Sequence, residues 1–197
     1  MEPIIKYFRA RKGYARMKDI KASGFQTRDI RNLVAEGRLE KVKPGLYRLA
    51  DISPGETSGL VEICLAMPRS IICLSSALAF HELTTFVPTS ISFAIPIPDK
   101  PVKLSYPPNK PYYFSDNQYK VGIEHRDTRA GLVRIYGPEK TVCDMFRFRN
   151  KLGEDLAIEG LKEYLKRRNR DLNKLMTFAK ICRANGIVSQ YVKAIVG

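Results

Sequence analysis

The segment 17–48, MKDIKASGFQTRDIRNLVAEGRLEKVKPGLYR, decides how the first part of the chain folds. A short helix is predicted over 17–23, and it ends at Gly24, because glycine readily adopts the left-handed conformation that follows many helices. A second helix is predicted from Thr27, its expected N-cap, to about Glu36, where another glycine ends it. Two short helices joined by a tight turn that contains glycine are typical of a helix-turn-helix.

The second of these helices has one apolar face and one cationic face. Ile30, Leu33 and Val34 are spaced i, i+3, i+4 and are expected to form the buried stripe. Arg28, Arg31 and Asn32 form the opposite stripe, and their side chains suit the guanine and adenine edges in a major groove. The pattern predicts a DNA-recognition helix, although a solvated helix face would have the same spacing.

A hairpin is predicted directly after this helix. Residues 38–42 alternate in polarity, Lys43-Pro44-Gly45 has turn chemistry, and 46–49 resumes as a strand. A hairpin in this position is a wing, whose cations can meet DNA phosphates beside the groove. The predicted DNA-binding residues are Lys18, Gln26, Thr27, Arg28, Arg31, Asn32, Arg38, Lys41, Lys43 and Arg48. Further candidate phosphate contacts are Arg11, Lys12, Arg167 and Arg168.

The net charge of the 197-residue chain is +14, and it is unevenly distributed. Residues 1–50 contain 13 Lys/Arg and 5 Asp/Glu, and residues 147–197 contain 12 and 5, whereas residues 51–146 contain 9 and 10. Concentrated positive charge is the electrostatic pattern expected of a protein that binds a polyanion, although it also serves general solubility.

The sequence favours a cytoplasmic protein without a cofactor. It has no apolar run of the roughly 18 residues that a membrane span needs, and no secretory signal pattern at its start. The four cysteines form no C-x-x-C pair and there are only two histidines, so neither a metal site nor any other cofactor is expected. Four reduced thiols in the core are the expected state.

The predicted fold class is α+β in two domains. A winged helix-turn-helix domain is predicted over 1–52, and a larger domain with a mainly antiparallel sheet and a helical C-terminal end over 56–197. The expected strands of the second domain are 71–73, 91–97, 102–104, 112–114, 121–126 and 132–136. Its expected helices lie near 60–67, 75–83, 142–146, 158–165, 172–182 and 188–195.

Together these segments resemble the AbiEi family, the antitoxins of the bacterial AbiE abortive-infection systems, which are type IV toxin–antitoxin systems. The resemblance covers nearly the whole chain, with one departure at Gly137, where a serine is expected before the proline. The residues that carry it are the runs 13–16, 38–42, 44–47, 72–81, 83–84, 138–142 and 149–151 together with Asp144.

This resemblance implies a function that the spacing of residues does not. The protein would repress its own operon by binding repeated operator elements in double-stranded DNA. It would also oppose a co-encoded nucleotidyltransferase-like toxin in antiviral defence, through a C-terminal domain that need not contact the toxin. An orphan regulator without a toxin, or a general nucleic-acid-binding protein, is the alternative.

A catalytic C-terminal domain is the least favoured interpretation. His81 lies on an apolar helical face, which is typical of a hydrogen-bonded core residue. Lys140 and Asp144 are spaced i, i+4 and are expected to form a surface ion pair. No phosphate-binding glycine loop and no hydrolase motif is present, so no enzyme is predicted. The basic run 166–170 would suit phosphate contacts or the exposed end of a helix.

Overall fold

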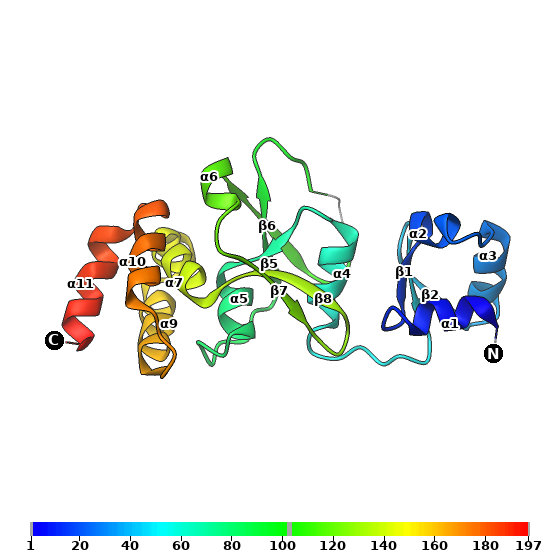
Figure 1. The fold of residues 1–197 in the computed structure, drawn as a ribbon, viewed down its shortest axis with the longest axis horizontal. Coiled ribbons are helices and arrows are strands. Elements are labelled where there is room, and N and C mark those ends of the chain that lie inside the picture. The colour runs from blue at the N-terminus through cyan, green and yellow to red at the C-terminus, as the bar shows by residue number, and fades with distance from the viewer. Residues whose placement is uncertain (1, 102–103, 197) are drawn as a thin grey trace. The chain divides into compact units, whose positions relative to one another are not determined.

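The computed structural model describes residues 2–101 and 104–196 (Figure 1). The chain divides into two compact units. The first is formed by the chain up to Pro68 together with Asp127–Val133. The second is formed by Arg69–Arg126 and the chain from Arg134 onward.

The first unit contains the predicted winged helix-turn-helix. Its helices α1, α2 and α3 pack beside a three-stranded antiparallel sheet of order β1-β3-β2 (Figure 1). Phe8, Ile20, Ile30, Leu33 and Leu49 are buried together as its core. The elements are α1 (Pro3–Arg9), β1 (Tyr14–Arg16), α2 (Met17–Ala22), α3 (Thr27–Ala35), β2 (Leu39–Lys43) and β3 (Leu46–Leu49).

The start of α3 differs by one residue from the prediction. Thr27 is the first residue of the helix, and Gln26 occupies the N-cap position instead. The backbone N–H of Gln26 donates to the Asp29 carboxylate at 3.2 Å. A carboxylate in the first turn is a strong acceptor and also suits the helix dipole, so Asp29 fixes the boundary in place of the Thr27 hydroxyl.

The first compact unit continues beyond residue 52. It includes α4 (Ser58–Ala66), which contacts the winged helix through polar side chains. The Tyr14 hydroxyl donates to the Glu62 carboxylate at 3.0 Å, and the Lys43 ammonium donates to the Ala66 carbonyl at 2.9 Å. The Lys12 ammonium donates to the Thr128 carbonyl at 2.6 Å. The functional boundary between the two predicted domains stays a prediction.

A five-stranded mixed sheet organises the second unit, in the order β6-β5-β4-β8-β7. Strand β4 pairs antiparallel with β5 and parallel with β8, and β5 pairs parallel with β6. Pro111 is tolerated in β6 because this strand lies at an edge of the sheet. Of the strand predicted at 102–104, residues 102 and 103 lie outside the described residues. The strands are β4 (Ile71–Ile72), β5 (Ile91–Pro96), β6 (Asn109–Phe114), β7 (Ile123–Asp127) and β8 (Leu132–Tyr136).

Helix α7 lies at the centre of the helical part of this unit. It contacts α5, α9, α10 and α11, and Figure 1 shows the last three gathered around it at the C-terminal end. The predicted α+β class with a helical C-terminal end is therefore confirmed. The helices are α5 (Leu74–Phe80), α6 (Asp116–Tyr119), α7 (Pro138–Arg147), α8 (Arg149–Leu152), α9 (Glu154–Lys166), α10 (Leu172–Ile181) and α11 (Asn185–Val196).

The prediction of a surface ion pair between Lys140 and Asp144 is wrong, because both side chains are 0% exposed. Neighbouring elements enclose α7 on several sides, so its polar stripe is buried as well as its apolar one. The Lys140 ammonium donates to Asp144 and lies 4.3 Å from the centre of the Tyr136 ring. The Cys182 thiol donates to the other Asp144 oxygen at 3.3 Å. Burial raises the pKa of Asp144, and the Lys140 ammonium partly offsets that rise.

Gly137, the departure from the family pattern, occupies the N-cap of α7. A Cβ atom at this position would lie 2.5 Å from an oxygen of the Glu124 carboxylate. A serine here would therefore require Glu124 to move. Glycine at this position leaves room for the Glu124 carboxylate, and α7 begins without a side-chain cap.

Candidate nucleic-acid interface

The outer face of α3 carries the residues predicted to read DNA. Ile30 and Leu33 are 0% and 4% exposed in the core, whereas Arg28, Arg31 and Asn32 are exposed on the opposite face. Among the described residues, neither arginine forms an ion pair with a carboxylate. Both guanidinium groups are therefore available to an external acceptor, and the asparagine amide lies one residue from Arg31 on the same stripe.

Cationic and polar side chains on the neighbouring elements flank this face. Lys18 is exposed on α2, and Gln26 is exposed at the start of α3, while Thr27 is half-buried. Lys41 is exposed on β2, where it pairs with Tyr47 of β3, and a β-bulge follows it before Lys43. Helix α3 and the wing thus each present at least one unpaired cation.

Two wing residues that were predicted to contact DNA, Arg48 and Lys43, instead bind groups within the protein. The Arg48 side chain is only 13% exposed, and its guanidinium donates to Glu40 across the hairpin and to Glu62 of α4 at 3.3 Å. Lys43 donates to the Ala66 carbonyl, and burial, with the nearby charge of Arg16, lowers its pKa. Arg48 and Lys43 therefore do not lie with Arg28, Arg31 and Lys41 among the exposed cations that could contact DNA.

Three other residues predicted to contact DNA, Arg38, Arg11 and Lys12, have partners within the protein. Arg38 is exposed but donates to Glu2 at 3.0 Å and to Glu36 at 3.5 Å, and these carboxylates raise its pKa. The Arg11 guanidinium stacks 3.7 Å from the centre of the Tyr7 ring and remains exposed. Lys12 is bound by Asp127 and by the Thr128 carbonyl.

The basic run after α9 belongs to the second unit. The Arg167 guanidinium donates to the backbone carbonyl of His81, which itself is buried with its Nε2 atom 2.7 Å from the Tyr136 carbonyl. Arg168 is exposed and, within the described residues, has no carboxylate partner. Arg168 is therefore the better placed of the two for a phosphate contact.

Sequence reasoning missed the residues of α4 that position the wing. Glu62 is 4% exposed and accepts from both Tyr14 and Arg48. Burial raises the pKa of the Glu62 carboxyl, and the hydrogen bond from Tyr14 and the charge of Arg48 offset part of the rise. An isolated carboxylate in the apolar run 60–67 was the available signal, because a buried charge requires partners.

The two short helices, the hairpin and the exposed cationic face of α3 define a winged helix-turn-helix protein. Residues 2–50, which extend from α1 to β3, match the family model described as "Transcriptional regulator, AbiEi antitoxin". The resemblance to this family is therefore confirmed over those residues, and it supports a role as a regulator and antitoxin.

Solved structures also include a chain that is similar in fold over nearly the whole length of this one. The crystal structure of the RV2827C protein from Mycobacterium tuberculosis matches with a TM-score of 0.50 and 14% sequence identity. The match covers 96% of this chain and 79% of that one. At this identity the likeness concerns the fold alone. No curated protein matches the sequence.

Between residues 2 and 196, apart from 102–103, no helix is both long and apolar enough to cross a membrane. Over the same residues, no group of three or more His, Cys, Asp or Glu side chains is placed to hold a metal ion. All four cysteines, Cys64, Cys73, Cys143 and Cys182, are buried.

Proposed function

We propose that this protein is a DNA-binding transcriptional repressor whose helix α3 enters the major groove. Arg28, Arg31 and Asn32 contact base edges, while Lys18 and Lys41 contact phosphates on either side. The observation that carries this proposal is the exposed, unpaired state of both α3 arginines opposite a buried apolar stripe. The family match over the same segment supports it.

The biological part of the proposal rests on the family. The protein represses its own operon through repeated operator elements and acts as the antitoxin against a co-encoded nucleotidyltransferase-like toxin in the cytoplasm. The second unit provides the antitoxic activity in abortive infection and carries no catalytic activity. The antitoxin part is tested by the growth of cells that express the neighbouring gene product with and without the full chain.

The DNA-binding part is tested by titration against the DNA upstream of the protein's own gene. A scrambled duplex serves as the sequence control, and each titration is made at two salt concentrations. The Arg28→Ala/Arg31→Ala variant is expected to lose selective binding. Its matched control is Arg69→Ala/Lys120→Ala, which removes two exposed cations that already have carboxylate partners in the second unit.

Two outcomes would contradict the specific repressor. Equal, weak binding of the unchanged protein to both duplexes would indicate a general nucleic-acid-binding protein. Equal loss of affinity in the α3 variant and in its control would indicate that total charge, not the α3 face, determines binding.

Alternatively, the second unit contributes to DNA binding through the basic residues at the end of α9. Arg168 is exposed there without a carboxylate partner in the described chain. If it contacts a phosphate, Arg168→Ala lowers the slope of log affinity against log salt by about 0.9. An unchanged slope would exclude Arg168 as a phosphate contact.

A further inference from the structure

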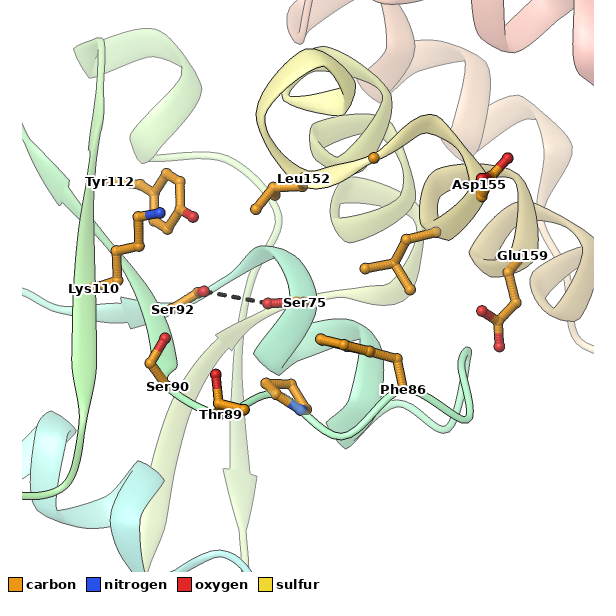
Figure 2. A pocket seen from close by; sticks show the side chains of 13 residues that line it. Ser75, Phe86, Thr89, Ser90, Ser92, Lys110, Tyr112, Leu152, Asp155 and Glu159 are labelled. Atoms are coloured by element: carbon orange, nitrogen blue, oxygen red, sulfur yellow. Dashed lines mark hydrogen bonds between the residues drawn. The ribbon is translucent and has the colours of Figure 1, made fainter.

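The second unit contains a cavity of about 490 Å³ that DNA binding does not use. It lies between the β5–β6 pair, α5, the segment before β5, and the start of α9 (Figure 2). Its volume is in the range of small-molecule sites in proteins. Its lining residues are Ser75, Phe86, Pro88, Thr89, Ser90, Ser92, Lys110, Tyr112, Leu152, Gly153, Asp155, Leu156 and Glu159.

One end of this cavity gathers hydrogen-bond donors and a positive charge. Ser92 of β5 and Lys110 of β6 are partners in the strand register, so their side chains lie on the same face of the sheet. Lys110 is exposed and, among the described residues, forms no ion pair with a carboxylate. Figure 2 shows Ser90 and Ser92 on the same side of the cavity as Lys110.

The hydroxyl groups at this end can still donate to a ligand. The Ser75 and Ser92 oxygens lie 3.3 Å apart, and because one hydroxyl donates to the other, one hydrogen of the pair remains unused. Ser75 and Ser92 are 7% and 3% exposed, so this donor is held in place by its surroundings. An ammonium group beside fixed hydroxyl donors is the chemistry that recognises a phosphate or a carboxylate.

The opposite end of the cavity carries a negatively charged hydrogen-bond acceptor, Glu159. Glu159 lies far from Lys110 in Figure 2, and its Oε1 atom already accepts from the Thr85 backbone N–H at 2.9 Å. That contact fixes the carboxylate and leaves Oε2 able to accept from a ligand. Phe86, which lies between Lys110 and Glu159 in Figure 2, is 48% exposed although it is aromatic, and Leu156 adds a second apolar side chain to the lining. The cavity therefore fits a molecule with an anionic end, a flat apolar body and a donor at its far end.

We propose that this cavity binds a nucleoside monophosphate whose base carries an exocyclic amino group. The phosphate lies at Lys110 and the serine hydroxyls, the base packs on Phe86, and the amino group donates to Glu159. This ligand has an anionic group, a flat apolar ring and a hydrogen-bond donor in the same order as the matching groups of the cavity. The proposal rests on the proposed function, because the bound nucleotide would then regulate the proposed repressor.

The test is calorimetric titration of the full chain with adenosine monophosphate. Lys110→Gln is expected to weaken binding by about tenfold or more, because it removes a charge-assisted hydrogen bond. The matched control is Lys162→Gln, which removes another exposed lysine, on α9, that does not line the cavity. Thermal unfolding of both variants checks that they fold.

The choice of ligands tests each end separately. Adenosine without the phosphate and inorganic phosphate alone are each expected to bind more weakly than the monophosphate. Inosine monophosphate, which lacks the amino group, is expected to bind more weakly than adenosine monophosphate, and Glu159→Gln is expected to reduce that difference.

Absence of heat with adenosine monophosphate at millimolar concentration would overturn the proposal, as would equal weakening by Lys110→Gln and Lys162→Gln. Operator titration of the same variants keeps the two proposals distinguishable. Lys110→Gln is expected to leave DNA affinity without nucleotide unchanged, so a loss at one site is separable from a loss at the other.

Discussion

The ion pair between Lys140 and Asp144 combines two opposing contributions to stability. Removing both charges from water costs several kcal/mol per ion, and their attraction at zero exposure offsets this cost only while both are present. The hydrogen bond from Cys182 and the rings beside the ammonium add to that compensation. Replacing one partner of this pair is therefore expected to lower the free energy of unfolding far more than replacing both with apolar residues.

Asp144→Asn is expected to lower the free energy of unfolding by about 3–5 kcal/mol, because it leaves the buried Lys140 ammonium without its counter-ion. Lys140→Met/Asp144→Leu is expected to recover most of that loss. Urea unfolding measures both. Asp116→Asn is the matched control, since the i, i+4 pair Lys120–Asp116 is about two-thirds exposed, and a change within about 0.5 kcal/mol is expected there. Equal effects at the two sites would contradict the role of burial.

His81 makes stability depend on pH. Burial lowers its pKa, and the Nε2–H of the neutral ring donates to the Tyr136 carbonyl. Between the ordinary histidine pKa of about 6.5 and the lower folded value, the unfolded chain binds more protons, so stability falls as pH falls. The contribution is fully present above about pH 6.5 and is lost as pH drops through the folded pKa.

Urea unfolding at pH 7, 6 and 5 tests this assignment. His81→Gln is expected to be less stable at pH 7 but to lose less stability on acidification than the unchanged protein. His125 is exposed, so His125→Gln is expected to keep the original pH dependence. If His81→Gln and His125→Gln lost the same stability on acidification, groups other than His81 would cause the pH dependence.

At the scale of elements, α3 and the wing are expected to affect DNA binding differently. Arg31→Ala is expected to cost about 1–3 kcal/mol and to relax the preference for one base position. Lys41→Ala is expected to weaken all sequences similarly and to lower the salt slope by about 0.9. Titrations with the operator and with single-base variants separate the two effects, and identical behaviour would contradict this division of roles.

The hairpin itself is held by α4. Because Arg48 donates to both Glu40 and Glu62 and is largely buried, Arg48→Ala is expected to lower the free energy of unfolding by about 1–3 kcal/mol. The salt slope of DNA binding is expected to stay unchanged, in contrast to Lys41→Ala. A reduced slope with unchanged stability would place Arg48 on DNA instead.

Local sequence predicted elements better than it predicted contacts. Gly24, Gly37 and the 3.6-residue spacing were sufficient for α2 and α3, because caps and periodicity depend on neighbours a few residues away. The α4 partners of Arg48 and Lys43, Glu62 and the Ala66 carbonyl, lie 14 and 23 residues further along the chain, so the pattern of the hairpin itself does not indicate these two contacts. The burial of Asp144 follows from helices that meet only in the folded second unit.

For the whole molecule, the extent of the first unit is testable with fragments. A fragment that ends at residue 52 lacks Glu62 and the Ala66 carbonyl, whereas one that ends at residue 68 retains both. The longer fragment is expected to be more stable by about 1–3 kcal/mol, since several buried polar groups keep their partners. Urea unfolding of the two fragments measures the difference. Equal stability would place the end of the cooperative unit at residue 52.

Lys12 and its partner Asp127 are 115 residues apart in the chain. A bacterial or eukaryotic ribosome adds about 5–20 residues per second, so on the order of ten seconds separates the synthesis of these two residues. The helix-turn-helix can form early from local contacts, but the segment 127–133 that completes its compact unit is translated much later. The nascent chain therefore passes through a period in which helix α3 exists before the compact unit that contains it is complete.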